Sequence, residues 1–272
     1  MAFWGMTVIL APVFGPILGG YISDDYSWQW IFYINIPLGI FVVVIGTPLL
    51  KRLETKREDY PFSYIAFGLL ILGVGSLQVL LDQGQQLGWW GSIEIRILTV
   101  ISVISLVYFI IWQIYDKNPI VDISLFKSLN FSISTVSISL GYLIYFGAIV
   151  LIPQLLQTVY GYTALWAGIA LAPIGILPVF LATSVAKLSD KYDLRLLISL
   201  SFIIYAICFF WRAYVFIPGV PISAVIWPQF IQGIALVFFL MPLTTMGLQD
   251  IPAEKLAAAT SLQNFLRTLA GS

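Results

Sequence analysis

Residues 15–39 read GPILGGYISDDYSWQWIFYINIPLG and join two apolar segments through one short polar stretch. The first six letters place three glycines and a proline where an apolar helix would otherwise be uninterrupted. Proline removes a backbone N–H donor, and glycine lets a second helix backbone approach closely inside lipid. Gly15 and Gly19 are four residues apart and share one helix face, which Ala11 extends. This spacing favours a seam at which another helix packs.

The composition around this stretch is that of a membrane protein. Hydrophobic residues make up 60% of the 272 residues, charged residues 10%, and the mean hydropathy is +0.97. Because a helix of about 20 apolar residues crosses the hydrocarbon layer, we predict an all-α polytopic membrane protein. Eight whole spans and a truncated ninth are predicted at 1–22, 30–50, 62–82, 95–115, 131–157, 164–186, 194–215, 224–248 and from 256 onward. We therefore expect an internal piece of a longer transmembrane protein.

The basic residues predict the orientation of these spans, since Lys and Arg in short loops stay on the cytoplasmic side. They occur in every second loop: Lys51, Arg52, Lys56 and Arg57; Lys117 and Lys127; Lys187, Lys191 and Arg195; and Lys255. The intervening loops SDDYSWQ, QGQQLGWWGSIE, GYT and IPGVPIS carry neither residue type. The first span is therefore predicted to run from the inside to the outside.

The charge and the reactive residues exclude several function classes. A net charge of +0 and a pI near 6.2 give no sign of a nucleic-acid partner. With no histidine and a single cysteine, the chain offers no histidine-based metal site, Cys/His nucleophile or internal disulfide. The cysteine, Cys208, lies within a predicted span and is expected to be a buried structural thiol. We predict no catalytic residue, no metal site and no enzyme activity.

The segment quoted first resembles the antiporter motif of the major facilitator superfamily. The family pattern G-P-x-x-G-G matches Gly15, Pro16, Gly19 and Gly20. The continuation W-x-W-I-F-x-I-N-x-P-x-G is matched at Trp28, Trp30, Ile31, Phe32, Asn35, Pro37 and Gly39. The string YFGAIVLIPQLLQTVYGYTALWAGIALAP at 145–173 is similar to the fourteen-helix drug:proton antiporters within that superfamily. The resemblance implies that the motif helix seals the interface between two helix bundles and favours export.

The resemblance also implies an architecture and a function. Residues 1–50 would end the first six-helix bundle, 51–127 would form a cytoplasmic loop and two extra linker helices, and 128–272 would begin the second bundle. The implied function is proton-coupled export of lipophilic drugs and toxic compounds across the bacterial inner membrane by alternating access. The proton gradient would drive export, and no cofactor would be needed. The partners would be the lipid bilayer, a periplasmic adaptor and an outer-membrane channel.

Two other functions stay open on the same residues. The first is export of one dedicated small molecule on this scaffold, and the second is a membrane sensor or scaffold that does not transport. Proton antiport needs an acidic group inside the membrane, and no Asp or Glu lies in the middle of a predicted span. By resemblance, the coupling acids would lie in earlier helices.

A charge cluster in the loop AKLSDKYDLRLLI resembles a decayed copy of the superfamily's cytoplasmic motif. Asp190, Lys191 and Arg195 match the motif, whereas Ala186 and Asp193 stand where glycine is expected. The cluster is either a gate that latches neighbouring helices or a solvated loop whose positive charge sets the topology.

For three other charged residues, the depth in the span predicts the surroundings of the side chain. Arg267 lies about eleven residues into the last span, and an arginine at that depth should face a cavity or an acidic partner. Asp82 and Arg212 lie at the outer ends of their spans, where we expect interfacial anchors.

Lipophilic, often cationic substrates would be bound by aromatic rings and a few polar groups. Two predicted spans offer such side chains at helical spacing, and by resemblance both line the central cavity. The candidates are Tyr142, Tyr145, Gln154, Gln157, Trp227, Gln229 and Gln232.

Overall fold

The computed structural model describes residues 2–51, 62–116, 119–217 and 219–271, and every regular element in these ranges is a helix. The N-terminal half contains α1 (Ala2–Asp25), α2 (Trp30–Tyr33), α3 (Asn35–Lys51), α4 (Tyr64–Gln83), η1 (Trp89–Gly91) and α5 (Ile93–Tyr115). The remainder contains η2 (Ile123–Lys127), α6 (Leu129–Thr158), α7 (Ala164–Leu171), α8 (Pro173–Lys191), α9 (Leu194–Val215), α10 (Ile222–Leu248), η3 (Ala253–Lys255) and α11 (Leu256–Gly271).

The helices agree with the spans predicted from hydropathy. Among the described residues, seven helical segments are long and apolar enough to cross a membrane, from Trp30–Lys51 to Ile222–Leu248. The first predicted span is the 24-residue helix α1, and the truncated ninth is α11. The fold class is therefore confirmed as an all-α polytopic membrane protein.

Two of the predicted spans are each divided into two helices. Pro173 has no backbone N–H, and the span that begins at Ala164 divides there into α7 and α8. The other break separates α2 from α3, and beside it the Asn35 side-chain amide donates to the carbonyl oxygen of Ile31 at 3.0 Å. Both breaks lie within single predicted spans.

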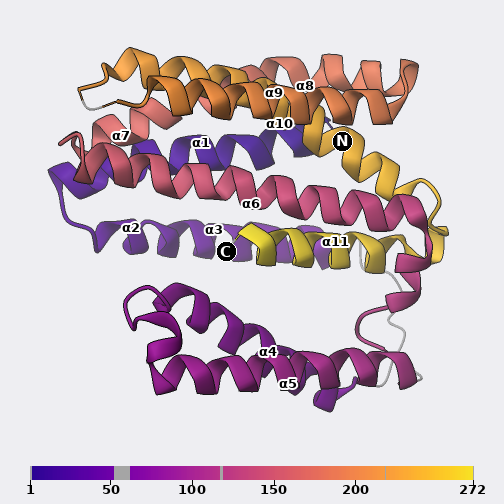
Figure 1. Ribbon diagram of the computed structural model, residues 1–272. Coiled ribbons are helices and arrows are strands. Elements are labelled where there is room, and N and C mark those ends of the chain that lie inside the picture. The colour runs from indigo at the N-terminus through magenta and orange to yellow at the C-terminus, as the bar shows by residue number, and fades with distance from the viewer. Residues whose placement is uncertain (1, 52–61, 117–118, 218, 272) are drawn as a thin grey trace.

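The connections alternate between the two ends of the helices, as the basic residues predict (Figure 1). The turns after α1, α4, α6 and α9 lie at one end of the molecule, and those that follow α8 and α10 lie at the other. Lys127, Lys187, Lys191, Arg195 and Lys255 belong to connections or helix ends at this second end. Arg52, Lys56, Arg57 and Lys117 lie outside the described residues.

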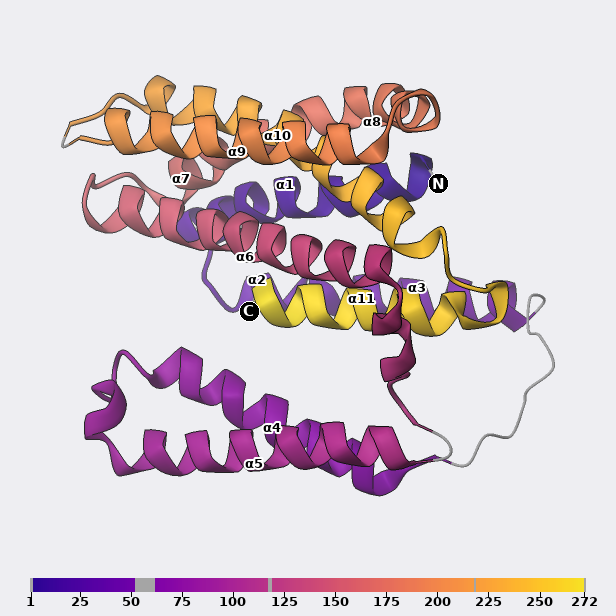
Figure 2. The same ribbon diagram turned by 45° about the vertical axis from the view of Figure 1, so that its right-hand side comes forward.

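The core lies among α6, α8, α9 and α10. Its largest buried cluster includes Ile138, Tyr145, Ile174, Tyr205 and Phe239. Helix α11 packs on α6, and α1 packs on α7 and α8. In both views α4 and α5 lie side by side as a hairpin set apart from this bundle (Figures 1 and 2). No described residue of α3 is buried.

An ion pair at the predicted cytoplasmic end ties the segment before α6 to the segment before α11. The Lys255 Nζ lies 2.6 Å from Oδ2 of Asp122 and also donates to the Ser124 hydroxyl. Partial burial by itself would raise the pKa of Asp122, but hydrogen bonds from Lys255 and Ser124 outweigh it and lower that pKa below the ordinary 3.8.

This lowered pKa predicts how acid acts on the contact. The contribution of Asp122 to stability is complete above its ordinary pKa and is lost as the pH falls through the lowered folded value. The contribution is small, at most about 1 kcal/mol, because the pair is partly exposed. We expect Asp122→Asn to lower the melting temperature at pH 7 and to remove part of its decline between about pH 5 and 3, as measured by differential scanning fluorimetry. An unchanged pH profile would contradict this assignment.

Candidate functional site

The motif helix α1 contacts α7 through Pro16 and Gly20. A Cβ atom on Gly20 would lie 2.5 Å from the carbonyl oxygen of Ala164, and one on Gly168 would lie closer than 3.0 Å to the carbonyl oxygen of Pro16. Real Cβ atoms essentially never come so close to backbone atoms. Glycine is therefore required on both sides of this crossing, where the two helix backbones touch.

A polar contact closes the same crossing at the predicted outer end. The backbone N–H of Leu165, in the first turn of α7, donates to Oδ2 of Asp24 at 2.8 Å. The carboxylate thereby satisfies one of the backbone donors that a helix leaves free at its N-terminus. Asp24 belongs to the polar stretch that follows the glycines, so this stretch helps to position α7 against α1.

The packed face of α1 differs from the seam predicted along Ala11, Gly15 and Gly19. No described atom would lie within 4 Å of a Cβ on Gly15 or Gly19. Spacing identifies residues that share a helix face, but it does not show which face meets a neighbour. The structure places Pro16 and Gly20 at α7, with Gly15 and Gly19 outside this contact.

The cytoplasmic charge cluster is solvent-exposed. Asp190, Lys191 and Arg195 are all exposed, and the described residues show no ion pair among them. Asp193, which occupies a glycine position of the family motif, caps α9 by accepting a hydrogen bond from the N–H of Arg195 at 2.9 Å. The geometry corresponds to a solvated loop with a helix cap.

Arg267 lies in α11 and faces an aromatic ring of α6. Its guanidinium carbon is 4.8 Å from the centre of the Tyr142 ring, within the range of a cation–π contact. Its Nε has no hydrogen-bond partner among the described residues. The described part of the chain gives Arg267 an aromatic neighbour and no acidic one.

Tyr142 and Tyr145 belong to an aromatic cluster between α6 and α10. The Tyr142 ring lies 5.7 Å from that of Phe146 and 6.4 Å from that of Phe239, and Tyr145 is buried. Tyr205 of α9 meets Phe239 edge-on at 6.0 Å. These rings couple α11, through Arg267, to the core of the bundle.

The other candidates for the substrate cavity lie in different places. Gln154 and Gln157, near the end of α6, are exposed, and so is Trp227 in α10. Gln229 and Gln232 are completely buried. The structure thus separates the seven candidates into the aromatic cluster, three exposed side chains and a buried glutamine pair.

Arg212 is buried and hydrogen-bonds both buried glutamines. The prediction that Arg212 is an interfacial anchor is therefore wrong. The side chain is only 5% exposed, and its Nη2 donates to Oε1 of Gln229 at 2.7 Å and to Oε1 of Gln232. Depth along α9 suggested an anchor, because Arg212 lies near the end of that helix. Burial follows from the packing of α9 on α10, which only the folded bundle shows.

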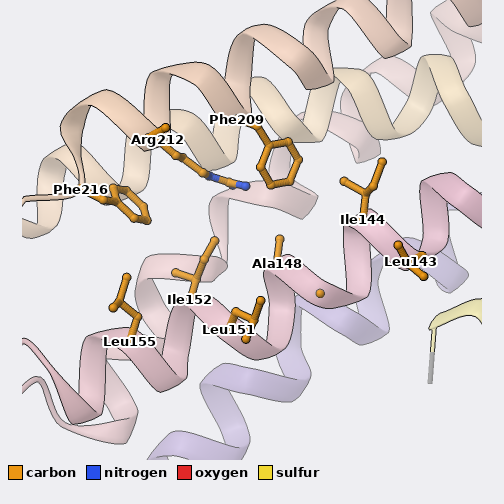
Figure 3. A pocket seen from close by; sticks show the side chains of 11 residues that line it. Leu143, Ile144, Ala148, Leu151, Ile152, Leu155, Phe209, Arg212 and Phe216 are labelled. Carbon is orange, nitrogen blue, oxygen red and sulfur yellow. The ribbon is translucent and has the colours of Figure 1, made fainter. Parts of the chain in front are cut away.

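A cavity of about 630 Å³ lies between α6 and α9 (Figure 3). Its lining is apolar apart from Arg212, whose side chain extends from α9 beside Phe209. The lining residues are Leu143, Ile144, Gly147, Ala148, Leu151, Ile152, Leu155, Phe209, Arg212, Ala213 and Phe216. None of the seven candidate side chains is among them.

The described residues contain no group of three or more Cys, Asp or Glu side chains that could hold a metal ion. Cys208 is buried, and its thiol donates to the carbonyl oxygen of Pro228 at 3.1 Å. Its burial confirms the expectation of a structural thiol. What the site offers is close helix crossings, aromatic rings and two arginines within apolar surroundings.

Comparison with known proteins agrees with this geometry. The sequence pattern of the Major Facilitator Superfamily matches residues 1–272, the full length of the chain. The chain belongs to this superfamily. Superfamily members are membrane transporters and not enzymes, so the predicted absence of an enzymatic role agrees with the family assignment.

Several superfamily members are similar to this chain over its full length. It is 56% identical over 272 residues to the multidrug export protein EmrB of Escherichia coli (strain K12), covering 100% of this chain and 53% of that protein. It is 47% identical over 271 residues to the fatty acid resistance protein FarB of Neisseria gonorrhoeae, again covering 100% and 53%. The chain therefore spans about half the length of the curated relatives that it matches.

A more distant relative is the lincomycin resistance protein LmrB of Bacillus subtilis (strain 168). It is 26% identical over 275 residues, covering 98% of this chain and 56% of LmrB. The names of these relatives refer to multidrug export and to resistance against an antibiotic or fatty acids. The resemblance of residues 15–39 to the major facilitator superfamily, and that of residues 145–173 to its drug exporters, are both confirmed.

Proposed function

We propose that the whole protein exports lipophilic drugs and other toxic compounds across the bacterial inner membrane by alternating access, driven by inward proton flow. The observation that carries the proposal is the similarity of this chain, over all of its own length, to about half of the multidrug export protein EmrB, together with the close crossing of the motif helix and α7. Alternating access requires two bundles that rock about a central site. The glycine crossing supplies a smooth contact at which one helix closes against another.

The proposed coupling uses the proton gradient and no cofactor. The acidic groups that exchange protons would belong to helices outside residues 1–272, because no Asp or Glu lies in the middle of a span here. The proposed partners are a periplasmic adaptor and an outer-membrane channel, which would carry the exported compound past the outer membrane.

Within this chain, we propose that Arg267 acts in the transport cycle through its contact with Tyr142. An arginine inside a membrane helix is expensive unless its charge is used or compensated. A cation–π contact contributes about 0.5–2 kcal/mol, so its loss would slow transport by up to about 30-fold. The contact joins α11 to α6, two helices that a rocking bundle would move together.

Drug-triggered proton release from inverted vesicles carrying the full-length protein tests both proposals. We expect lipophilic drugs to release protons from an acidified lumen, and Arg267→Ala to reduce the initial rate about tenfold. Lys187→Ala, which removes an exposed lysine, is the matched control and should keep the rate.

Two results of this experiment would contradict parts of the proposal. Wild-type flux that persists in Arg267→Ala would make Arg267 a structural residue. No flux with any drug, in vesicles that contain correctly inserted protein, would overturn drug:proton antiport and favour a dedicated exporter or a scaffold.

A further inference from the structure

A second cavity, of about 320 Å³, lies between the end of α5 and η2. We call it the α5–η2 pocket. Its lining includes side chains of both charges, among them Asp116, Asp122 and Lys127. Helix α5 ends at Tyr115, so the pocket lies where a membrane span meets the predicted cytoplasmic side. This is the level of the lipid headgroups, which border the hydrocarbon layer.

The Gln113 side chain in this pocket has a buried hydrogen-bond donor without a described partner. Gln113 is only 3% exposed, and its Oε1 accepts a hydrogen bond from the backbone N–H of Val121 at 3.0 Å. This contact holds the amide in place, and no described residue accepts a hydrogen bond from its Nε2. A buried polar atom that stays unsatisfied costs free energy, so nearly all such atoms have a partner. The Nε2 atom therefore indicates an acceptor that a bound molecule would supply.

The charged side chains of the pocket offer one place for a cation and one for an anion. Asp122 is paired with Lys255. Asp116 accepts a hydrogen bond from the Trp112 indole N–H at 2.9 Å, and the two oxygen atoms of a carboxylate can accept about four. Lys127 is exposed, and no ion pair within the described ranges includes it. A molecule that complements this pocket therefore carries both an ammonium group and an anionic oxygen.

An exposed apolar column on α5 begins at the pocket. Val107, Ile110 and Ile114 are three and four residues apart, so they share one helix face. They are 49%, 51% and 61% exposed, and Ile114 also lines the pocket. Helix α5 packs on α4, and this hairpin lies apart from the bundle (Figures 1 and 2). A ligand that enters the pocket from the membrane would place hydrocarbon chains on this column.

We propose that the α5–η2 pocket binds the headgroup of phosphatidylethanolamine from the cytoplasmic leaflet. The ammonium group lies at Asp116, the phosphate lies at Lys127 and the Gln113 amide, and the acyl chains follow the apolar column of α5. Each end of the headgroup then forms charge-assisted hydrogen bonds with a group of opposite charge. The inference depends on the membrane location of the chain and not on which compound the whole protein exports.

The two ends of the headgroup predict which lipids bind. Phosphatidylcholine has a quaternary ammonium group without N–H donors, and phosphatidylglycerol has no cation. Both keep the phosphate, so each should bind the pocket, but more weakly than phosphatidylethanolamine does. A ligand that binds the folded protein alone raises its melting temperature, so phosphatidylethanolamine should also stabilise the protein most.

Native mass spectrometry and differential scanning fluorimetry of the full-length protein in detergent micelles test the site. The three lipids are added with identical acyl chains, so that they differ only in the headgroup. We expect phosphatidylethanolamine to stay bound at the lowest lipid concentration and to give the largest increase in melting temperature.

Two variants remove the charges of the pocket one at a time. We expect Asp116→Asn and Lys127→Gln each to weaken phosphatidylethanolamine binding about 3- to 10-fold, which lies between the effects of an exposed ion pair and a buried charged hydrogen bond. Asp116→Asn keeps an oxygen atom for the Trp112 N–H, so the melting temperature without added lipid should stay unchanged. Asp190→Asn and Lys187→Gln are the matched controls, because they remove the same charges at exposed positions of α8.

Four results would overturn the site. The first is equal binding of the three lipids, and the second is stronger binding of phosphatidylglycerol, which would indicate a site for anions only. The third is phosphatidylethanolamine binding that both pocket variants retain or that the control variants lose equally. The fourth is competition by water-soluble glycerophosphoethanolamine at the same concentration as the lipid, which would exclude a membrane lipid as the preferred occupant. Drug-triggered proton release is measured separately, so failure of this site leaves the proposed export function standing.

Discussion

Replacing Gly20 with alanine is expected to destabilise the full-length protein by about 1–3 kcal/mol, whereas the same replacement at the adjacent Gly19 should have a much smaller effect. A methyl group on Gly20 would lie 2.5 Å from the Ala164 carbonyl oxygen, and a backbone atom cannot rotate out of the way as a side chain can. The helices α1 and α7 would have to separate. The separation would also lengthen the hydrogen bond from the Leu165 N–H to Asp24.

The melting temperature and the drug-triggered proton flux of the two variants measure this difference. We expect Gly20→Ala to lower both and Gly168→Ala, on the opposite side of the crossing, to do the same. Gly19→Ala is the matched control, because it adds the same methyl group one residue away. Equal loss in Gly19→Ala and Gly20→Ala would show that the close crossing is not confined to the Pro16 and Gly20 face.

This contrast shows what the sequence can and cannot predict about α1. The motif letters identify a helix that packs closely, because glycine and proline in an apolar span have few other uses. They do not identify its partner, which lies about 145 residues later in the chain at Ala164 and Gly168. The register of Gly20 against α7 is a tertiary property, and spacing alone favoured the face of Gly15 and Gly19.

The spans themselves could be predicted because hydropathy reports directly on burial in lipid. The predicted span 131–157 is the helix Leu129–Thr158, and 224–248 is Ile222–Leu248. The division of the span from Ala164 at Pro173 was missed, although the proline itself was the available signal. Hydropathy depends only on residue types, so a broken helix and a continuous helix of the same residues have the same value.

The site residues were harder to predict than the helices. Polarity and helical spacing identify Gln229 and Gln232 as candidates, but their hydrogen-bond partner comes from α9. Arg212 looked like an anchor because its distance from the helix end was the only information about its depth. The useful signal was the pairing of one buried cation with two amides on a neighbouring span, which becomes visible only when α9 and α10 are packed together.

The aromatic cluster that carries Tyr142 and Tyr145 depends on a second close approach, between α6 and α10. A Cβ on Gly141 would lie closer than 3.0 Å to several atoms of the Phe239 ring. That ring is completely buried and is held by Tyr142, Phe202 and Tyr205. Because the ring cannot move aside, we expect Gly141→Ala to destabilise the protein by about 1–3 kcal/mol through overpacking.

Removing the Phe239 ring should destabilise the protein more than Gly141→Ala does. It should also change the effect of Gly141→Ala on stability. Phe239→Ala leaves a cavity and is expected to cost about 3–5 kcal/mol. In that background the alanine at position 141 enters empty space, so the double variant should be at least as stable as Phe239→Ala alone. Unfolding of the four proteins in a double-mutant cycle measures this coupling. Strict additivity would show that Gly141 and Phe239 do not share the space, and the close approach of α6 to α10 would then have to be assigned to other residues.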